Sequence, residues 1–163
     1  MDILEFALEK ERVSREYYLD LAEKTSHSGL RKIFQMLADQ ESDHYDTIKH
    51  MKSHISPSLT ETKVLEEARG IFQKIQESSN DFDFSTSELE AYEMARENET
   101  KSMNFYLDKA KEAEDNARKN LFLALADEEK KHYTVLDNIC DFVSEPQRYL
   151  EDAEFVHIEG YPA

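Results

Sequence analysis

Glutamate and histidine residues recur along this chain at one fixed spacing of 88 positions. In each copy a Glu stands three residues before a His, so both side chains leave a helix on one face and can bind one metal ion. In each copy a further Glu stands alone, 30 residues before the Glu of this pair. This pattern predicts a carboxylate and imidazole site for two metal ions. Its predicted ligands, which are also the predicted catalytic residues, are Glu11, Glu41, His44, Glu99, Glu129 and His132.

Four carboxylates in a helical core require compensating positive charge. A buried carboxylate either takes up a proton or costs several kcal/mol of desolvation. Two divalent cations would supply four positive charges and cancel the four negative ones. Tyr18 and Tyr106 follow the single glutamates by seven residues, about two helical turns, and so fall on the same face. We expect their hydroxyls to hydrogen-bond the ligand carboxylates.

The repeat extends well beyond the ligand positions. Residues 7–24 match residues 95–112 at eight of 18 positions, and residues 30–48 match 118–136 at seven of 19, without a gap. Shared composition alone does not keep one register over two segments. The Glu-x-x-His pair by itself is a weak motif, because Glu154 and His157 form a third pair outside the repeat. We interpret that pair as a coincidence. The histidines expected on the surface are His27, His50 and His54.

Apolar residues at helical spacing predict an all-α fold. The expected class is a four-helix bundle made of two duplicated helical hairpins joined by a long crossover. We expect Ser87 to cap the third long helix, with Glu90 three residues later. The long helices are predicted at about residues 2–24, 30–53, 87–114 and 115–143, with a crossover at about 55–86 that contains one short helix. Residues 1–145 form the predicted domain, and residues 146–163 an irregular C-terminal tail that packs on the bundle or on a partner subunit.

Composition restricts the partners of this 163-residue chain. It has 36 Asp and Glu against 20 Lys and Arg, and a net charge of −16 repels nucleic acids and anionic membrane surfaces. No apolar stretch approaches the roughly 20 residues of a membrane span, and no leader sequence is apparent, so we expect a cytoplasmic protein. With Cys140 as the single cysteine, any metal must be held by carboxylates and imidazoles.

The segments LADQESDHYDTI, LADEEKKHYTVL and ALEKERVSREYYLDLA resemble rubrerythrins, members of the ferritin-like di-iron carboxylate superfamily, over about residues 3–143. The resemblance implies a centre of two iron ions on the six ligands. It also implies an oxidoreductase of oxidative-stress defence, a peroxidase or oxidase that reduces hydrogen peroxide or dioxygen. Rubrerythrins usually carry a rubredoxin domain with two Cys pairs, which this sequence does not contain. Electrons would then come from a separate carrier protein.

A second departure from the family keeps an alternative function open. Rubrerythrins usually have a further glutamate one turn after the position of Glu99, where this chain has Ser102. The six-ligand set therefore also resembles ferroxidase centres of iron-handling proteins, and a non-redox metal-binding bundle is a third hypothesis. An oxygen-rich site without thiolate favours iron, although manganese or zinc is possible. We expect a homodimer, the commonest symmetric assembly.

Overall fold

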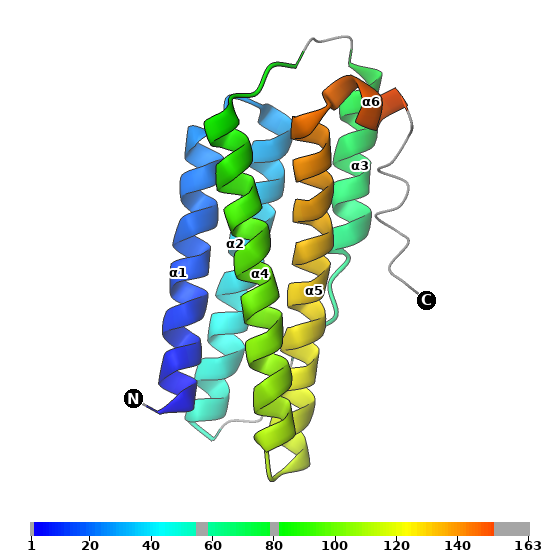
Figure 1. Ribbon diagram of the computed structural model, residues 1–163. Coiled ribbons are helices and arrows are strands. Elements are labelled where there is room, and N and C mark those ends of the chain that lie inside the picture. Colours follow the sequence, from blue (N-terminus) through cyan, green and yellow to red (C-terminus); the bar gives the residue numbers. More distant parts are fainter. Residues whose placement is uncertain (1, 55–58, 79–81, 152–163) are drawn as a thin grey trace. The chain divides into compact units, whose positions relative to one another are not determined.

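Every regular element in the described part of the chain is an α-helix. The computed structural model describes residues 2–54, 59–78 and 82–151 (Figure 1). None of the helices in these ranges is long and apolar enough to cross a membrane. The predicted all-α fold and the helix inside the crossover are confirmed. The helices are α1 (Ile3–Lys24), α2 (Ser28–Lys52), α3 (Val64–Glu77), α4 (Thr86–Glu112), α5 (Asn116–Ser144) and α6 (Pro146–Glu151).

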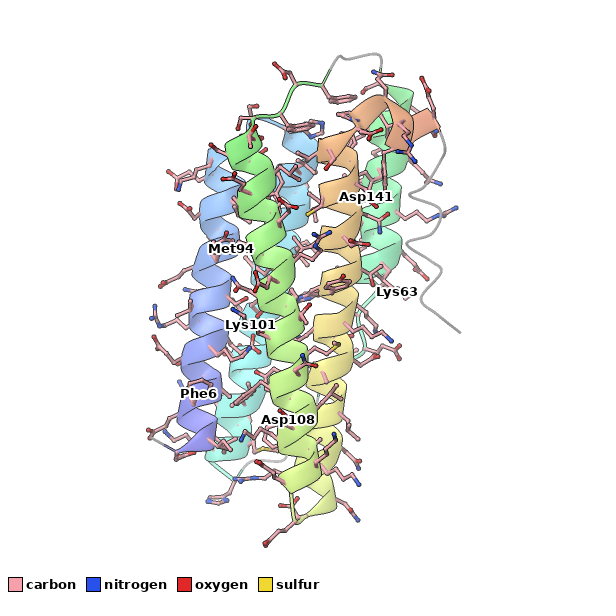
Figure 2. All side chains as sticks on the ribbon, in the orientation of Figure 1. Phe6, Lys63, Met94, Lys101, Asp108 and Asp141 are labelled. Atoms are coloured by element: carbon pink, nitrogen blue, oxygen red, sulfur yellow. The ribbon has the colours of Figure 1, made fainter. Side chains whose placement is uncertain are left out.

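The chain divides into two compact units, and the first comprises residues 1–61 and 105–126. Here α1 and α2 pack as a hairpin, and the last turns of α4 and the first turns of α5 complete the core. Phe6, which is 49% exposed (Figure 2), places its ring 5.3 Å from that of Phe105. The ring of Tyr106 stacks on Phe122 at 6.2 Å. These aromatic contacts, at distances typical of favourable ring pairs, join α1, α4 and α5.

The turn between α1 and α2 satisfies the backbone groups that the two helix ends leave open. The guanidinium of Arg31 donates to the carbonyl oxygens of Ala22 at 3.1 Å and Thr25 at 2.6 Å, at the end of α1. At the start of α2, the Nδ1 atom of His27 accepts a hydrogen bond from the backbone N–H of Leu30 at 3.3 Å. His27 is therefore half-buried and caps a helix, rather than standing on the surface as the sequence suggested.

The second unit comprises residues 62–104 and 127–163, and an aromatic cluster forms part of its core. The ring of Phe72 on α3 lies 5.6 Å from Phe142 on α5 and 5.2 Å from Tyr149 on α6. The buried hydroxyl of Tyr149 donates to Oδ1 of Asn138 at 2.8 Å. Burying three rings removes a large apolar area from water and so joins α3, α5 and α6.

The predicted irregular tail is wrong in its first part, because Pro146–Glu151 form the short helix α6. Proline favours the first position of a helix, where its missing N–H costs nothing. Burial of Tyr149 and Leu150 then stabilises this short helix, which no local sequence pattern predicted. The remaining tail, with Glu154 and His157, lies outside the described residues.

The N-terminus of α4 is capped two residues earlier than predicted. The Oγ atom of Ser85 accepts from the backbone N–H of Glu88 at 3.1 Å, and Glu88 Oε1 accepts from the N–H of Ser85 at 3.4 Å. Both Ser85 with Glu88 and Ser87 with Glu90 fit the capping-box pattern, so the pattern could not decide between them. The predicted start of α5 is confirmed, since Asp115 Oδ1 accepts from the N–H of Arg118 at 2.7 Å.

Replacing the observed cap should destabilise the protein, and replacing the expected cap should not. Ser85→Ala removes the acceptor for the Glu88 N–H and should lower the free energy of unfolding by about 1 kcal/mol. Ser87→Ala is the matched control, because Ser87 is exposed within the first turn and should change stability little. Urea unfolding followed by circular dichroism measures both. A larger loss in Ser87→Ala would contradict the capping assignment.

Candidate metal centre

Three of the predicted ligands lie together in the first unit, on α1 and α2. Glu11, Glu41 and His44 are each at most 1% exposed, and one ligand atom of each lies within 4.8 Å of the other two. His44 Nδ1 is 3.5 Å from Glu11 Oε2 and 3.9 Å from Glu41 Oε1. These separations are long for hydrogen bonds. They are closer to the spacing of ligands that each lie about 2.1 Å from one shared metal ion. We call these residues the first triad.

A tyrosine orients the first triad from α4. The hydroxyl of Tyr106, which is fully buried, donates a short hydrogen bond to Glu11 Oε1. The other oxygen, Oε2, is buried and accepts no hydrogen bond from the described residues. The phenol therefore fixes the Glu11 carboxylate and leaves one oxygen available to a ligand. Tyr18 is also buried, at 2% exposed, and the role of its hydroxyl stays a prediction.

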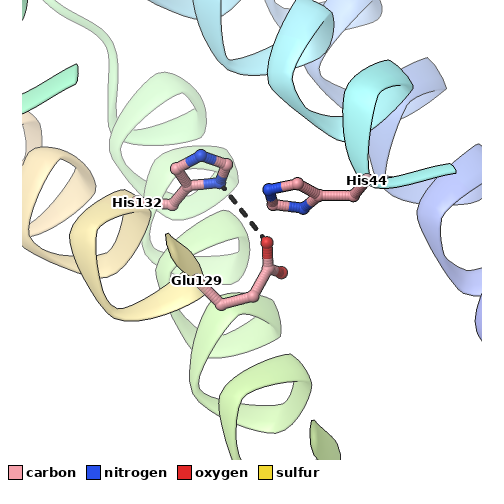
Figure 3. A group of neighbouring side chains, drawn as sticks. All are labelled: His44, Glu129 and His132. Carbon is pink, nitrogen blue, oxygen red and sulfur yellow. Dashed lines mark ion pairs between the residues drawn. The ribbon is translucent and has the colours of Figure 1, made fainter. Parts of the chain in front are cut away.

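The second unit holds the other three predicted ligands, Glu99 on α4 with Glu129 and His132 on α5. They too are at most 1% exposed. His132 Nδ1 lies 3.6 Å from Glu99 Oε1 and 3.7 Å from Glu129 Oε1, and Figure 3 marks the second of these pairs. We call these residues the second triad. It has the same residue types as the first triad and similar distances between them, which is expected if the two copies of the repeat fold alike.

Burial makes the second triad electrostatically unfavourable without a cation. Desolvation raises the pKa of Glu99 from 4.5 to about 7, and the neighbouring Glu129 carboxylate pushes it in the same direction. His132 opposes this shift. A carboxylate with a raised pKa holds a proton where a cation could bind instead. Oxygen and imidazole donors without thiolate suit iron or another borderline divalent ion, so both triads fit metal binding.

A buried ion pair beside the second triad was not predicted. Lys131 Nζ lies 2.7 Å from Glu128 Oε2, and Glu128 Oε1 accepts from the backbone N–H of Thr62 at 3.1 Å. Although burial acts to raise the pKa of Glu128, the bonds from Lys131 and Thr62 lower it overall. This pair connects the crossover to α5 directly beside the ligand Glu129. Its sequence signal, Glu and Lys three residues apart, is too common on helices to single out.

The comparison with protein families agrees with this ligand composition. The family model for rubrerythrin matches residues 2–140. The chain belongs to the rubrerythrin family. No curated protein and no solved structure matched it. Family membership implies the ferritin-like all-α class and a di-iron centre, and the buried Glu and His groups are suited to hold metal.

The metal-free protein should lose stability as the pH rises toward 7. The pKa of Glu99 is about 7 in the folded state against an ordinary value of 4.5. The folded state therefore binds this proton more tightly, so the stabilising contribution is complete below pH 4.5 and is lost as the pH rises through about 7. Melting temperatures of chelator-treated protein across this range measure the effect. Glu99→Gln should flatten the profile, and an unchanged slope in that variant would contradict the assignment.

Loss of the Tyr106 hydroxyl should weaken metal binding by the first triad. Tyr106→Phe keeps the ring contacts but removes the donor to Glu11, so we expect about tenfold weaker ferrous iron affinity. Anaerobic titration against a competing chelator measures this. Tyr17→Phe is the control, because Tyr17 lies on α1 near Asp20 and Lys24 rather than in a triad. Equal affinity in wild type and Tyr106→Phe would show that the hydroxyl does not support the ligand.

Proposed function

We propose that the two triads together hold a di-iron centre that reduces hydrogen peroxide or dioxygen with electrons from a separate carrier protein. The observation that carries the proposal is the occurrence of two buried triads, each with two carboxylates and one imidazole. Membership of the rubrerythrin family supports iron as the metal and oxidoreduction as the chemistry.

In this proposal each residue type has a distinct task. Glu41 with His44, and Glu129 with His132, would each bind one ion through side chains one helical turn apart. Glu11 and Glu99 stand alone on their helices, and each would add a second carboxylate to the Glu and His pair of its own triad. Tyr106 would hold Glu11 in place through its hydrogen bond. Glu99, whose pKa burial raises, would release its proton when the metal binds.

Iron would supply the electrons that the side chains cannot. Reduction of hydrogen peroxide breaks one O–O bond and consumes two electrons and two protons to give two waters, so each turnover needs re-reduction from outside. The net charge of −16 favours an electron carrier with a basic docking surface. We further propose a homodimer as the assembly, the commonest symmetric arrangement.

A ferroxidase function is the second candidate, favoured by Ser102. This residue is 6% exposed and stands one turn after Glu99, where rubrerythrins usually have a further glutamate. The centre would then have six protein ligands and would oxidise ferrous iron as its substrate. Native mass helps to separate the two functions, because storage of oxidised iron requires a shell of many subunits.

Anaerobic loading with two equivalents of ferrous iron, followed by stopped-flow mixing with hydrogen peroxide or dioxygen, tests the proposal. Faster oxidation by peroxide is expected for the reductase, whereas faster oxidation by dioxygen would favour the ferroxidase. Glu99→Ala should lower the iron stoichiometry, since it removes a buried ligand. Glu97→Ala is the control, because Glu97 is exposed on the same helix. Equal iron loss in both variants would refute the ligand assignment.

A further inference from the structure

A cleft of about 320 Å³ in the first unit reaches two residues of the first triad. Glu11 and Glu41 line it, although both side chains are at most 1% exposed, so they form its inner wall. Glu11 Oε2 is buried and accepts no hydrogen bond from the described residues. The cleft thus connects solvent with a carboxylate oxygen that is available to a ligand.

The outer part of the cleft adds further oxygen donors from α2. Asp46 is exposed, and Ser42 and Tyr45 are half-buried along the same lining. Carboxylate, hydroxyl and phenol oxygens are the donors that hard and borderline divalent cations accept. The space also suffices for a hydrated ion, since six waters at about 30 Å³ each occupy roughly 180 Å³.

The charges of the cleft favour a cation despite two arginines in its lining. Arg12 is already engaged at the surface, where its guanidinium pairs with Glu9 and, at 2.8 Å, with Glu16. Arg15 is exposed and so is well screened by solvent. Three carboxylates, those of Glu11, Glu41 and Asp46, face these two positive groups. A cleft lined by an excess of one charge raises the local concentration of the opposite one.

The duplication shows that this lining is not a general consequence of holding the ligands. Adding 88 to the residue number keeps every ligand of the triad, but it turns Asp46 into Thr134 and Ser42 into Lys130. The second copy therefore lacks the outer carboxylate and carries a lysine at the position of Ser42, while Thr100 and Met103 stand where the first copy has Arg12 and Arg15. The outer carboxylate of this approach is thus a feature of the first copy.

We propose that this cleft is the access route by which a divalent metal ion reaches Glu11 and Glu41, and that Asp46 takes the ion from solvent first. The proposal rests on the proposed function only in that the metal centre is the ion's destination. Asp46 acts on the rate of uptake, because it binds the ion in passing and is not one of the final ligands.

Stopped-flow uptake of cobalt(II) by the metal-free protein, followed by ligand-field absorbance, tests this route without requiring activity. Asp46→Asn should slow uptake about fivefold at low ionic strength and leave the final stoichiometry unchanged. The difference should shrink in about 0.5 M salt, where surface charges are screened. Arg15→Gln removes a repelling charge and should speed uptake. Asp43→Asn is the matched control, because Asp43 is exposed one turn earlier on α2 and does not line the cleft.

Each result bears on the route. Equal slowing by Asp46→Asn and Asp43→Asn would show a general charge effect and overturn it. Lower cobalt stoichiometry in Asp46→Asn would make Asp46 a final ligand and would also overturn the proposed route. Slower uptake in Arg15→Gln would overturn the route as well. Normal uptake with no effect of Asp46→Asn would overturn the route alone, whereas no cobalt binding by the wild type would overturn the proposed metal centre as well.

Discussion

The constraint on which the structure depends is the burial of like charges. Each unit places two carboxylates and an imidazole at or below 1% exposure, among apolar neighbours such as Leu37 and Ala38 on the same turns of α2. Several kcal/mol of desolvation per ion cannot be recovered from helix propensity or from ring contacts alone. Protons or cations must therefore compensate, which couples the stability of these helices to pH and to metal.

The two units meet this constraint differently. In the first, the buried hydroxyl of Tyr106 donates a hydrogen bond to the Glu11 carboxylate. In the second, burial and the neighbouring Glu129 carboxylate raise the pKa of Glu99. The ion pair of Glu128 with Lys131 lies beside it and, through Thr62, secures the crossover. One triad thus has a hydrogen-bond donor on another helix, and the other has a carboxylate whose raised pKa favours its protonated form.

The sequence predicted the parts of the site that the duplication repeats. The fixed offset of 88 residues selected, from the many glutamates, residues that lie together and buried in each unit, and the ligand role of these residues stays a prediction. The sequence misplaced the cap of α4, since Ser85 and Ser87 satisfy the same local pattern and the pattern alone does not decide between them. It also missed α6, because Tyr149 holds that helix through contacts with α3 and α5 that no local periodicity encodes.

The positions that differ between the copies explain why the two triads are not equivalent. The Glu and His residues of the two triads are the same in both copies, whereas residues on the neighbouring helical face differ. In the first copy that face carries Ser42 and Asp46 and borders a cleft. The second copy carries Lys130 and Thr134 at those positions, and next to them Lys131, which replaces Asp43, is buried in its pair with Glu128. Each copy thus keeps its three predicted ligands, while the residues around them attach the crossover in one copy and line a cleft in the other.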